Sequence, residues 1–262
     1  MKIITLLTDF GSFYPAQMKG VILSRLVDKA QDITFVDITH DIPPQDVRAG
    51  AFALLSSARY FPPGTIHLAV VDPGVGTDRL GLVVESGGQL FVGPDNGLLL
   101  PATRSLSTPG NPLQAYKIAL PLEALGFCAG LGPGPTGGPA PVSHTFHGRD
   151  VFAPVAALLA SGSSPEVIGP RVRPKDLNFG VAKRTNRGVE ATVIYVDRFG
   201  NLVLNMRKVP SFRVSLKGIK LKPVRTYAQA RRIEPLITLG SHGFAEIAVN
   251  QGNAAEAFCL KA

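Results

Sequence analysis

Three aspartates in the first 75 residues each follow a short apolar segment. A carboxylate at the carboxyl end of a parallel strand can bind both hydroxyls of a ribose, as it does in dinucleotide-binding folds. An aspartate in such a place also commonly caps the next turn or helix, so position alone leaves both interpretations open. The three residues are Asp9, Asp41 and Asp72.

Four histidines accompany these aspartates, which makes a metal-dependent nucleosidase or phosphatase an alternative to weigh. None of them has the paired spacing of a zinc site, so no metal site is predicted. His147 stands immediately before a predicted helix, where the helix dipole favours a neutral imidazole that can position a water molecule. No Walker A or GxGxxG pattern is present, so no phosphate site is predicted. The four residues are His40, His67, His144 and His147.

The elements that must position these residues alternate along the first 125 residues. Apolar runs of strand length end just before the three aspartates, and segments with helical apolar spacing separate the runs. This order predicts a parallel α/β sheet. The predicted strands are 2–7, 33–38 and 65–71. The predicted helices are 15–28 and a stretch that follows Pro43-Pro44 and runs to Ala58, and 80–85 with 89–92 is predicted to form a hairpin.

The character of the chain changes twice after this region. Residues 126–142 are rich in glycine and proline and are predicted to form a flexible loop that orders when substrate binds. A helix is expected from about Asp150, with that residue as its N-cap. Short apolar runs separated by turn residues then predict a small all-β domain. The proposed division is an α/β domain over 1–170 and the second domain over 175–262.

Composition restricts the class of protein. Hydrophobic residues make up 45% of the 262 residues and charged residues 18%, an ordinary globular balance. The net charge of +8 is concentrated between Arg171 and Arg232, where 16 Lys and Arg face three acids. A basic stretch of this kind can attract RNA, but it is also typical of a solvated face, and aromatic residues for stacking are sparse. No nucleic-acid partner is therefore predicted.

The same counts bear on location. The apolar run at the N-terminus is too short for a signal peptide, and no segment has the roughly 20 apolar residues of a membrane helix. Cys128 and Cys259 show neither a disulfide framework nor metal-ligand spacing. The sequence predicts a cytoplasmic protein without a membrane partner.

Six short motifs, in order along nearly the whole chain, resemble the S-adenosyl-L-methionine (SAM) hydroxide adenosyltransferases, relatives of the SAM-dependent fluorinases and chlorinases. Any one of these motifs alone is weak evidence for the family, but all six in the family's order are strongly specific for it. The motifs are Leu7-Thr8-Asp9-Phe10-Gly11, Val71-Asp72-Pro73-Gly74-Val75-Gly76, Gly93-Pro94-Asp95-Asn96-Gly97, Thr145-Phe146-His147-Gly148-Arg149-Asp150, Asp197-Arg198-Phe199-Gly200-Asn201 and Gly240-Ser241-His242-Gly243, the last followed by Asn250 to Ala255.

The resemblance implies a fold and an assembly. It implies an N-terminal α/β domain joined to a smaller C-terminal β-barrel, in a homotrimer whose active sites lie between one subunit's N-terminal domain and a neighbour's C-terminal domain. It implies no cofactor and no metal.

The resemblance also implies which residues bind the substrate. Asp9 would hold the ribose hydroxyls, Asp197 and Ser241 the methionine amine and carboxylate, and Asn201 the adenosine portion. Backbone groups near Asn253 and Ala254 would contact adenine. Glu246 is counted with the same substrate-binding set.

The reaction implied is hydrolysis of SAM to adenosine and L-methionine. A sulfonium is already a good leaving group, so the site needs chiefly an oriented water or hydroxide in line with the ribose C5′–S bond. In the family an Asp, an Arg and a His handle this water, and they correspond to Asp72, Arg79 and His147. A halogenase, and a non-catalytic SAM or adenosine sensor whose basic half binds RNA, remain alternatives. The presence of both Arg79 and His147 favours water over halide.

Overall fold

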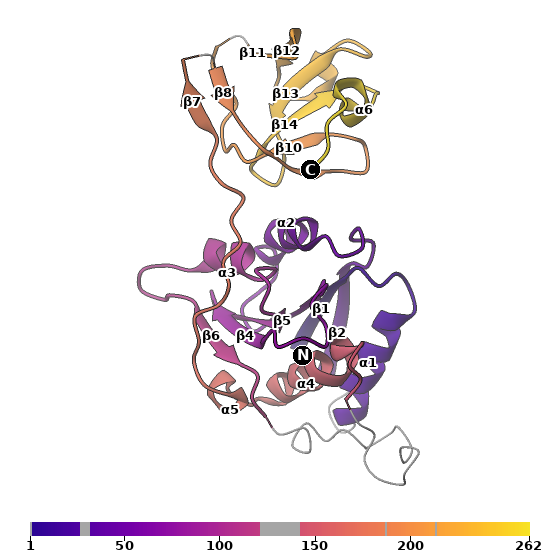
Figure 1. The fold of residues 1–262 in the computed structure, drawn as a ribbon, viewed down its shortest axis with the longest axis vertical. Helices are drawn as coiled ribbons and strands as arrows, with labels where there is room; N and C mark the ends of the chain where they lie inside the picture. The colour runs from indigo at the N-terminus through magenta and orange to yellow at the C-terminus, as the bar shows by residue number, and fades with distance from the viewer. Residues whose placement is uncertain (1, 27–31, 121–141, 187, 213) are drawn as a thin grey trace. The chain divides into compact units, whose positions relative to one another are not determined.

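The chain forms two compact units, Met1–Leu177 and Asn178–Ala262. The structure, a computed structural model, describes residues 2–26, 32–120, 142–186, 188–212 and 214–262. Residues 126–141 of the segment predicted as a flexible loop lie outside these ranges. Each unit is built around its own sheet (Figure 1).

The first unit contains a mixed six-stranded sheet in the order β2-β1-β3-β5-β4-β6. The first four strands of that order pair in parallel, and β4 is antiparallel to both of its neighbours. The predicted α/β arrangement with parallel strands and the predicted β4–β5 hairpin are thus confirmed, within a sheet that is mixed. The strands are β1 (Lys2–Thr8), β2 (Ile33–Thr39), β3 (Ile66–Val70), β4 (Gly81–Ser86), β5 (Gln89–Pro94) and β6 (Gln114–Lys117).

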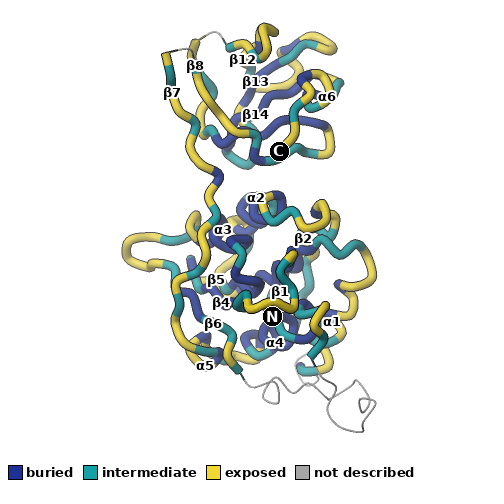
Figure 2. Tube along the Cα trace, in the orientation of Figure 1, coloured by how far each residue is buried: buried dark blue, intermediate teal, exposed yellow. Residues whose placement is uncertain are grey.

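Helices cover both faces of this sheet, which explains why the central strands are apolar throughout rather than alternating. Ile4 and Leu6 of β1 belong to the core formed with α1 and α4, and their neighbours in β1 are buried on the opposite side, where α2 and α3 lie (Figures 1 and 2). The helices are α1 (Tyr14–Arg25), α2 (Val47–Ala58), α3 (Leu100–Leu106), α4 (Ala153–Ser161) and the short α5 (Pro165–Ile168).

The chain enters α4 through a π-helical turn, η2 (Gly148–Phe152). The prediction that Asp150 caps this helix is wrong, because Asp150 lies inside the turn and its backbone N–H already bonds the Phe146 carbonyl. Its buried carboxylate instead accepts hydrogen bonds from the Ser143 backbone, at 2.8 Å, and from the Arg149 guanidinium. Asp150 therefore fastens the segment that leads into the helix.

The second unit is a six-stranded sheet in the order β11-β12-β13-β14-β10-β9, curled into a half-barrel, with a separate β7–β8 hairpin. No pairing between β9 and β11 closes it among the residues that the structure describes. The elements are β7 (Lys183–Thr185), β8 (Gly188–Glu190), β9 (Val193–Val196), β10 (Leu202–Leu204), β11 (Val214–Leu216), β12 (Ile219–Pro223), the 3₁₀ turn η3 (Tyr227–Gln229), β13 (Pro235–Leu239), β14 (Ala245–Val249) and α6 (Ala254–Phe258).

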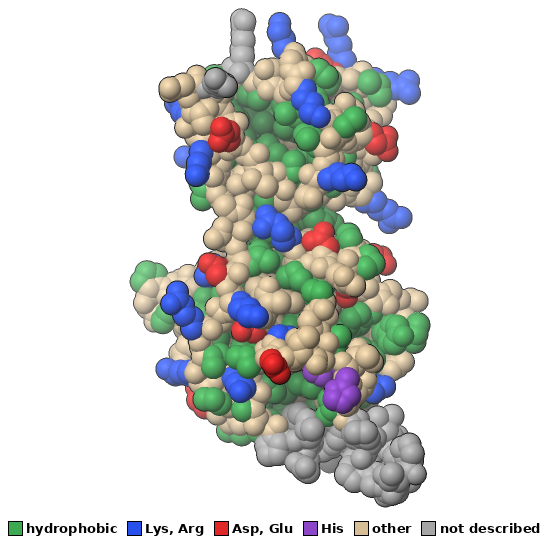
Figure 3. Space-filling model, in the orientation of Figure 1, with side chains coloured by type: hydrophobic (Ala, Val, Ile, Leu, Met, Phe, Trp, Pro, Cys, Tyr) green, Lys and Arg blue, Asp and Glu red, His purple; other side chains and the backbone are tan. Residues whose placement is uncertain are grey.

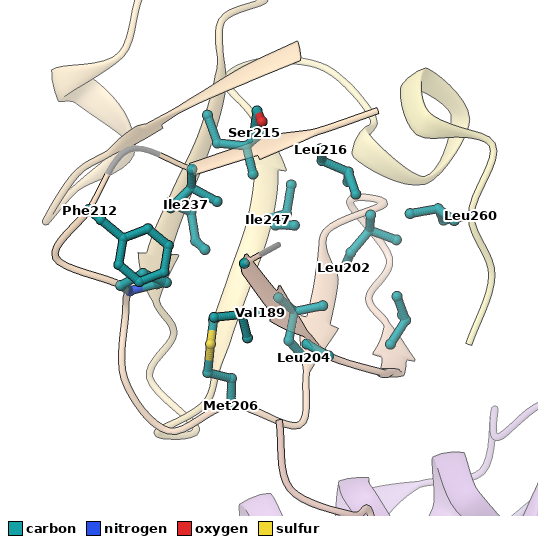
Figure 4. Close-up of a pocket in the computed structure, with 16 residues that line it drawn as sticks. Val189, Leu202, Leu204, Met206, Phe212, Ser215, Leu216, Ile237, Ile247 and Leu260 are labelled. Carbon is teal, nitrogen blue, oxygen red and sulfur yellow. The ribbon is translucent and has the colours of Figure 1, made fainter. Parts of the chain in front are cut away.

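A cavity of about 250 Å³ lies on the concave side of this curled sheet (Figure 4). Leu202, Leu221, Ile237 and Ile247 line it, and the same side chains belong to the hydrophobic core of the second unit. None of the predicted site residues lines this cavity. We therefore regard it as core space of the half-barrel.

In the part of the chain that the structure describes, no helix has the length and apolar character needed to span a bilayer.

Candidate active site

The three sequence-predicted aspartates of the first unit lie along one edge of its sheet. Asp9 follows the end of β1, Asp41 lies two residues after β2, and Asp72 lies two residues after β3. Because these strands are parallel neighbours in the order β2-β1-β3, their carboxyl ends meet at the same edge. This is the edge at which open α/β sheets bind ligands.

Asp9 is held by one contact from the loop that precedes α2. The backbone N–H of Gln45 donates to Asp9 Oδ2 at 2.7 Å. Gln45 has φ 65°, a left-handed conformation that is uncommon for a residue with a side chain. The loop thus orients the Asp9 carboxylate, and Asp41, by contrast, is exposed.

The loop after β3 folds back so that Arg79 meets Asp72. Two turns produce this reversal, with Val75 N–H donating to the Asp72 carbonyl and Thr77 N–H to the Gly74 carbonyl. Arg79 Nε lies 3.0 Å from both carboxylate oxygens, and its terminal nitrogen lies 2.5 Å from Oδ2. The Asp72 and Arg79 side chains are only 4% and 7% exposed, so this is a buried, bidentate ion pair.

His147 completes the group from a segment 68 residues further along the chain. An Arg79 terminal N–H donates to His147 Nδ1 at 2.7 Å. A guanidinium has no acceptor, so Nδ1 must carry the lone pair and Nε2 the hydrogen. Burial, together with the nearby Arg79 charge, lowers the pKa of His147 below its usual value. The imidazole is therefore neutral with a fixed tautomer at neutral pH.

The free nitrogen of His147 is the chemically available group. Nε2 makes no hydrogen bond with any other described residue, and it is not among the buried atoms that lack partners. As an N–H, it can donate to an oxygen or to an anion. Arg79 cannot take up a proton, and His147 Nδ1 is occupied by Arg79, so neither residue can act as a general base in this arrangement.

A close backbone contact fixes the loop of Asp72 and Arg79 against the segment of His147. Gly76 has φ 78°, and a Cβ placed on it would lie 2.5 Å from the His144 carbonyl oxygen. Only glycine allows this approach without displacement of one of the two segments. The Arg79–His147 contact thus depends on a glycine that itself carries no chemistry.

The predicted residues of the second unit form two clusters. In the first, the Asp197 carboxylate accepts hydrogen bonds from the backbone of Phe199 and Asn201, at 2.9 and 2.8 Å, and from the Asn201 amide at 2.8 Å. These contacts build a tight turn between β9 and β10. Asp197 therefore has a structural role of the kind that aspartate commonly plays in turns.

This turn packs on the start of α6. A Cβ on Gly200 would lie 2.0 Å from Asn253 Oδ1, and the Gly200 carbonyl accepts from Ala255 N–H at 2.9 Å. Asn253 caps α6 by accepting from Glu256 N–H at 3.0 Å, and Ala254 is fully buried. The structure thus brings Asp197, Asn253 and their neighbours together.

The second cluster surrounds Glu246, which is 4% exposed on β14. Its carboxylate accepts a hydrogen bond from the Tyr227 hydroxyl and lies 3.2 Å from His242 Nε2. Burial raises the pKa of Glu246, but these two partners outweigh it and hold the pKa below its usual value. Burial and the adjacent carboxylates, Glu246 and Asp197, raise the pKa of Tyr227.

Sequence reasoning missed Tyr227, whose hydroxyl donates to the Glu246 carboxylate. In the sequence it is one tyrosine in a basic, turn-rich segment, and nothing in that pattern distinguishes it from a solvated residue. Ser241 is exposed in the turn between β13 and β14. In the described ranges, no group of three or more His, Cys, Asp or Glu is arranged to hold a metal ion.

The fold and this site define an α/β protein with a polar, partly buried site at the carboxyl ends of parallel strands in a mixed sheet. The chain belongs to the SAM hydroxide adenosyltransferase family: the model of its N-terminal domain matches residues 4–169, and that of its C-terminal domain matches residues 191–262. The resemblance stated from the motifs is confirmed.

Several relatives match over nearly the full chain. An (R)-S-adenosyl-L-methionine hydrolase of Thermus thermophilus is 39% identical, covering 100% of this chain and 97% of its own. A fluorinase of Nocardia brasiliensis is 26% identical, covering 99% and 94%. The crystal structure of an uncharacterized conserved protein from Thermotoga maritima has a TM-score of 0.80 at 31% identity, covering 98% and 96%.

Proposed function

We propose that this protein hydrolyses SAM to adenosine and L-methionine. The oxygen of a bound water or hydroxide forms a bond to ribose C5′ as the C5′–S bond breaks. The electron pair of that bond stays on sulfur, which leaves as a neutral thioether, and a water nucleophile releases one proton to solvent. Support comes from the hydrolase relative, which is 39% identical over the whole chain.

The Arg79–His147 hydrogen bond is the observation that carries the proposal. It turns a neutral N–H of His147 outward as a donor, and the buried Asp72 carboxylate holds Arg79 in the orientation that this requires. A donor of this kind holds the nucleophile oxygen by a lone pair and leaves another lone pair directed at the substrate. In a site shielded from bulk water, this positioning lowers the barrier chiefly by orientation.

The remaining residues bind the substrate in this proposal. Asp9 holds the ribose hydroxyls, Asp197 and Ser241 the methionine amine and carboxylate, and Asn201 the adenosine portion. The backbone near Asn253 and Ala254 contacts adenine, and Glu246 supports the methionine end. Glu246 and Asp197 also add negative charge, which suits a substrate with a cationic sulfonium and a cationic amine.

We propose further that the protein acts in the cytoplasm as a homotrimer whose sites combine residues of two subunits, and that it needs no metal or cofactor. The curled sheet of the second unit corresponds in this proposal to the C-terminal β-barrel of the family. These proposals rest on the family membership together with the motifs that the chain carries.

A halogenase is the second candidate, because a fluorinase is among the relatives. A halide is also a nucleophile that N–H donors bind. Two features favour water: the identity to the hydrolase is higher than that to the fluorinase, and Arg79 and His147 are both present.

Chromatography of SAM incubated with pure, EDTA-treated protein tests the proposal, with and without chloride or fluoride. We expect adenosine and L-methionine in every sample. A halogenated nucleoside that appears only with halide would establish the second candidate. Intact SAM in every sample, with SAM or adenosine retained after dialysis, would overturn both reactions and leave a binding protein.

A further inference from the structure

A line of polar side chains lies behind the turn that carries Asp9. Thr8 Oγ1 lies 2.9 Å from His40 Nδ1, and His40 Nε2 lies 3.2 Å from Asp37 Oδ1. Lys19 Nζ donates to the other oxygen of Asp37 at 2.6 Å. We call Thr8, His40, Asp37 and Lys19 the His40 network. It connects β1, α1 and the end of β2.

The network contains a charged pair next to His40. Lys19 and His40 outweigh the effect of burial and hold the pKa of Asp37 below its usual value, so Asp37 is a carboxylate. His40 Nε2 is buried and faces this carboxylate, although the contact is too bent to count as a hydrogen bond. An N–H on Nε2 is favoured there over a lone pair, and the other ring nitrogen, Nδ1, lies within hydrogen-bond distance of the Thr8 hydroxyl.

The Thr8 hydroxyl also contacts the turn. Thr8 Oγ1, which forms a hydrogen bond with His40 Nδ1, accepts the Phe10 backbone N–H at 3.3 Å. The His40 carbonyl accepts Gly11 N–H at 3.1 Å, and Gly11 has φ 68°. His40 thus fixes both ends of the turn, by its side chain and by its backbone, with Asp9 between them.

We infer that His40 is a positioning residue for ribose binding: it holds the Thr8–Gly11 turn so that Asp9 meets the ribose hydroxyls in a fixed orientation. The inference rests on the role proposed for Asp9. His40 acts through Thr8 and contacts no reacting atom. Asp72, Arg79 and His147 lie on other segments, and no hydrogen bond of the His40 network reaches them among the described residues. The turn touches the segment of His147 through the rings of Phe10 and Phe146. We therefore expect loss of the network to weaken binding more than it slows the chemical step.

Two variants at one position separate the network from simple packing. His40→Phe keeps a ring and removes both nitrogens, whereas His40→Asn keeps an acceptor near the place of Nδ1. For His40→Phe we expect the adenosine Kd and the KM for SAM to rise about tenfold, as for the loss of one useful hydrogen bond, with kcat changed less than about twofold. His40→Asn should recover most of the affinity.

Calorimetry with adenosine and steady-state hydrolysis of SAM give the two readouts. If His40→Phe keeps the wild-type Kd for adenosine and KM for SAM, the inference is overturned and the proposed function still stands. A fall in kcat without a change in Kd or KM would have the same consequence. A wild-type protein that binds adenosine without hydrolysing SAM would refute the reaction, while its Kd would still test the inference. If His40→Phe does not fold, Asp37→Asn provides the same test, because it removes the negative charge that faces His40 Nε2.

Discussion

Arg79 connects the carboxylate of Asp72 to the imidazole of His147, and this contact fixes which nitrogen of His147 carries the hydrogen. One edge of its guanidinium binds Asp72, and a remaining N–H donates to His147 Nδ1. Because the ion pair is buried, removing either partner leaves a charge without its counterpart, and that is costly. The ring of Phe152, 5.2 Å from the guanidinium carbon, contacts the same group. Arg79 is therefore fixed before any ligand binds.

Replacing Arg79 or His147 by alanine should lower kcat about 100-fold, the order found when a positioned catalytic group is removed. The adenosine Kd should change less than about threefold, because neither residue is proposed to touch adenosine. Single-turnover rates and calorimetry measure the two quantities. Arg104→Ala is a matched control, since the ion pair of Arg104 with Asp176 is exposed. Equal losses of kcat and affinity would instead make Arg79 and His147 substrate-binding residues.

A second histidine, His67, should make stability depend on pH. It is fully buried in β3 between Thr5 and Gln89, and burial lowers its pKa from 6.5 to about 4. Since the unfolded chain binds the proton below pH 6.5 and the native protein only near pH 4, stability is full above pH 6.5 and falls as the pH drops between these values.

The loss attributable to His67 should reach about 3 kcal/mol by pH 4. Urea unfolding of wild type and of His67→Gln at several pH values measures it, because only the wild type carries this ionisation. Parallel pH profiles for the two proteins would contradict the assignment.

At the scale of elements, the sequence predicted the strands, because local apolar patterns determine them. The apolar runs before Asp9 and Asp72 located β1 and β3, and parallel pairing brings their ends to one edge. Spacing along the chain could not predict the Arg79–His147 contact, which tertiary packing forms across 68 residues and which only the family resemblance suggested. The Asp150 cap was wrong because a π-helical turn begins two residues earlier. A local capping pattern in the sequence does not distinguish a residue that caps a helix from one that lies inside a π-helical turn.

The contact between Gly76 and His144 gives a prediction at this scale. Gly76→Ala should lower kcat at least tenfold, because a Cβ would push the loop of Asp72 and Arg79 away from the segment of His147. Gly64→Ala is the matched control: Gly64 has φ 85° and open space around it, so it shares the backbone strain without the contact.

Thermal unfolding and kcat are compared for the two glycine variants. Similar losses of stability with a loss of kcat only in Gly76→Ala would support the account. Equal kcat values would show that the contact does not position the catalytic group.

For the whole molecule, the division into two units separates the proposed roles. Asp72, Arg79 and His147 belong to the first unit, and Asp197, Ser241 and Glu246 to the second. Lys and Arg side chains are spread over the visible face of the second unit rather than gathered into one patch (Figure 3). That distribution favours a solvated basic surface over a track for nucleic acid.

The proposed homotrimer predicts complementation between inactive chains. Light scattering should give a mass three times 27.7 kDa. Asp72→Ala and Asp197→Ala should each be inactive alone. When they are co-expressed, some mixed trimers combine an intact first unit of one chain with an intact second unit of another, and activity should return to roughly a quarter of the wild-type level or less. No recovery in verified mixed trimers would place each site within one chain.

The distance along the chain between Arg79 and His147 has a consequence during synthesis. A ribosome has made more than half of the polypeptide before His147 is added, and β1, β3, Asp72 and Arg79 are already present by then. The incomplete chain thus holds the carboxylate and the guanidinium but no imidazole for them to orient. In the proposed mechanism, a nascent chain or fragment that ends before His147 lacks the N–H donor for the nucleophile, so we expect it not to hydrolyse SAM.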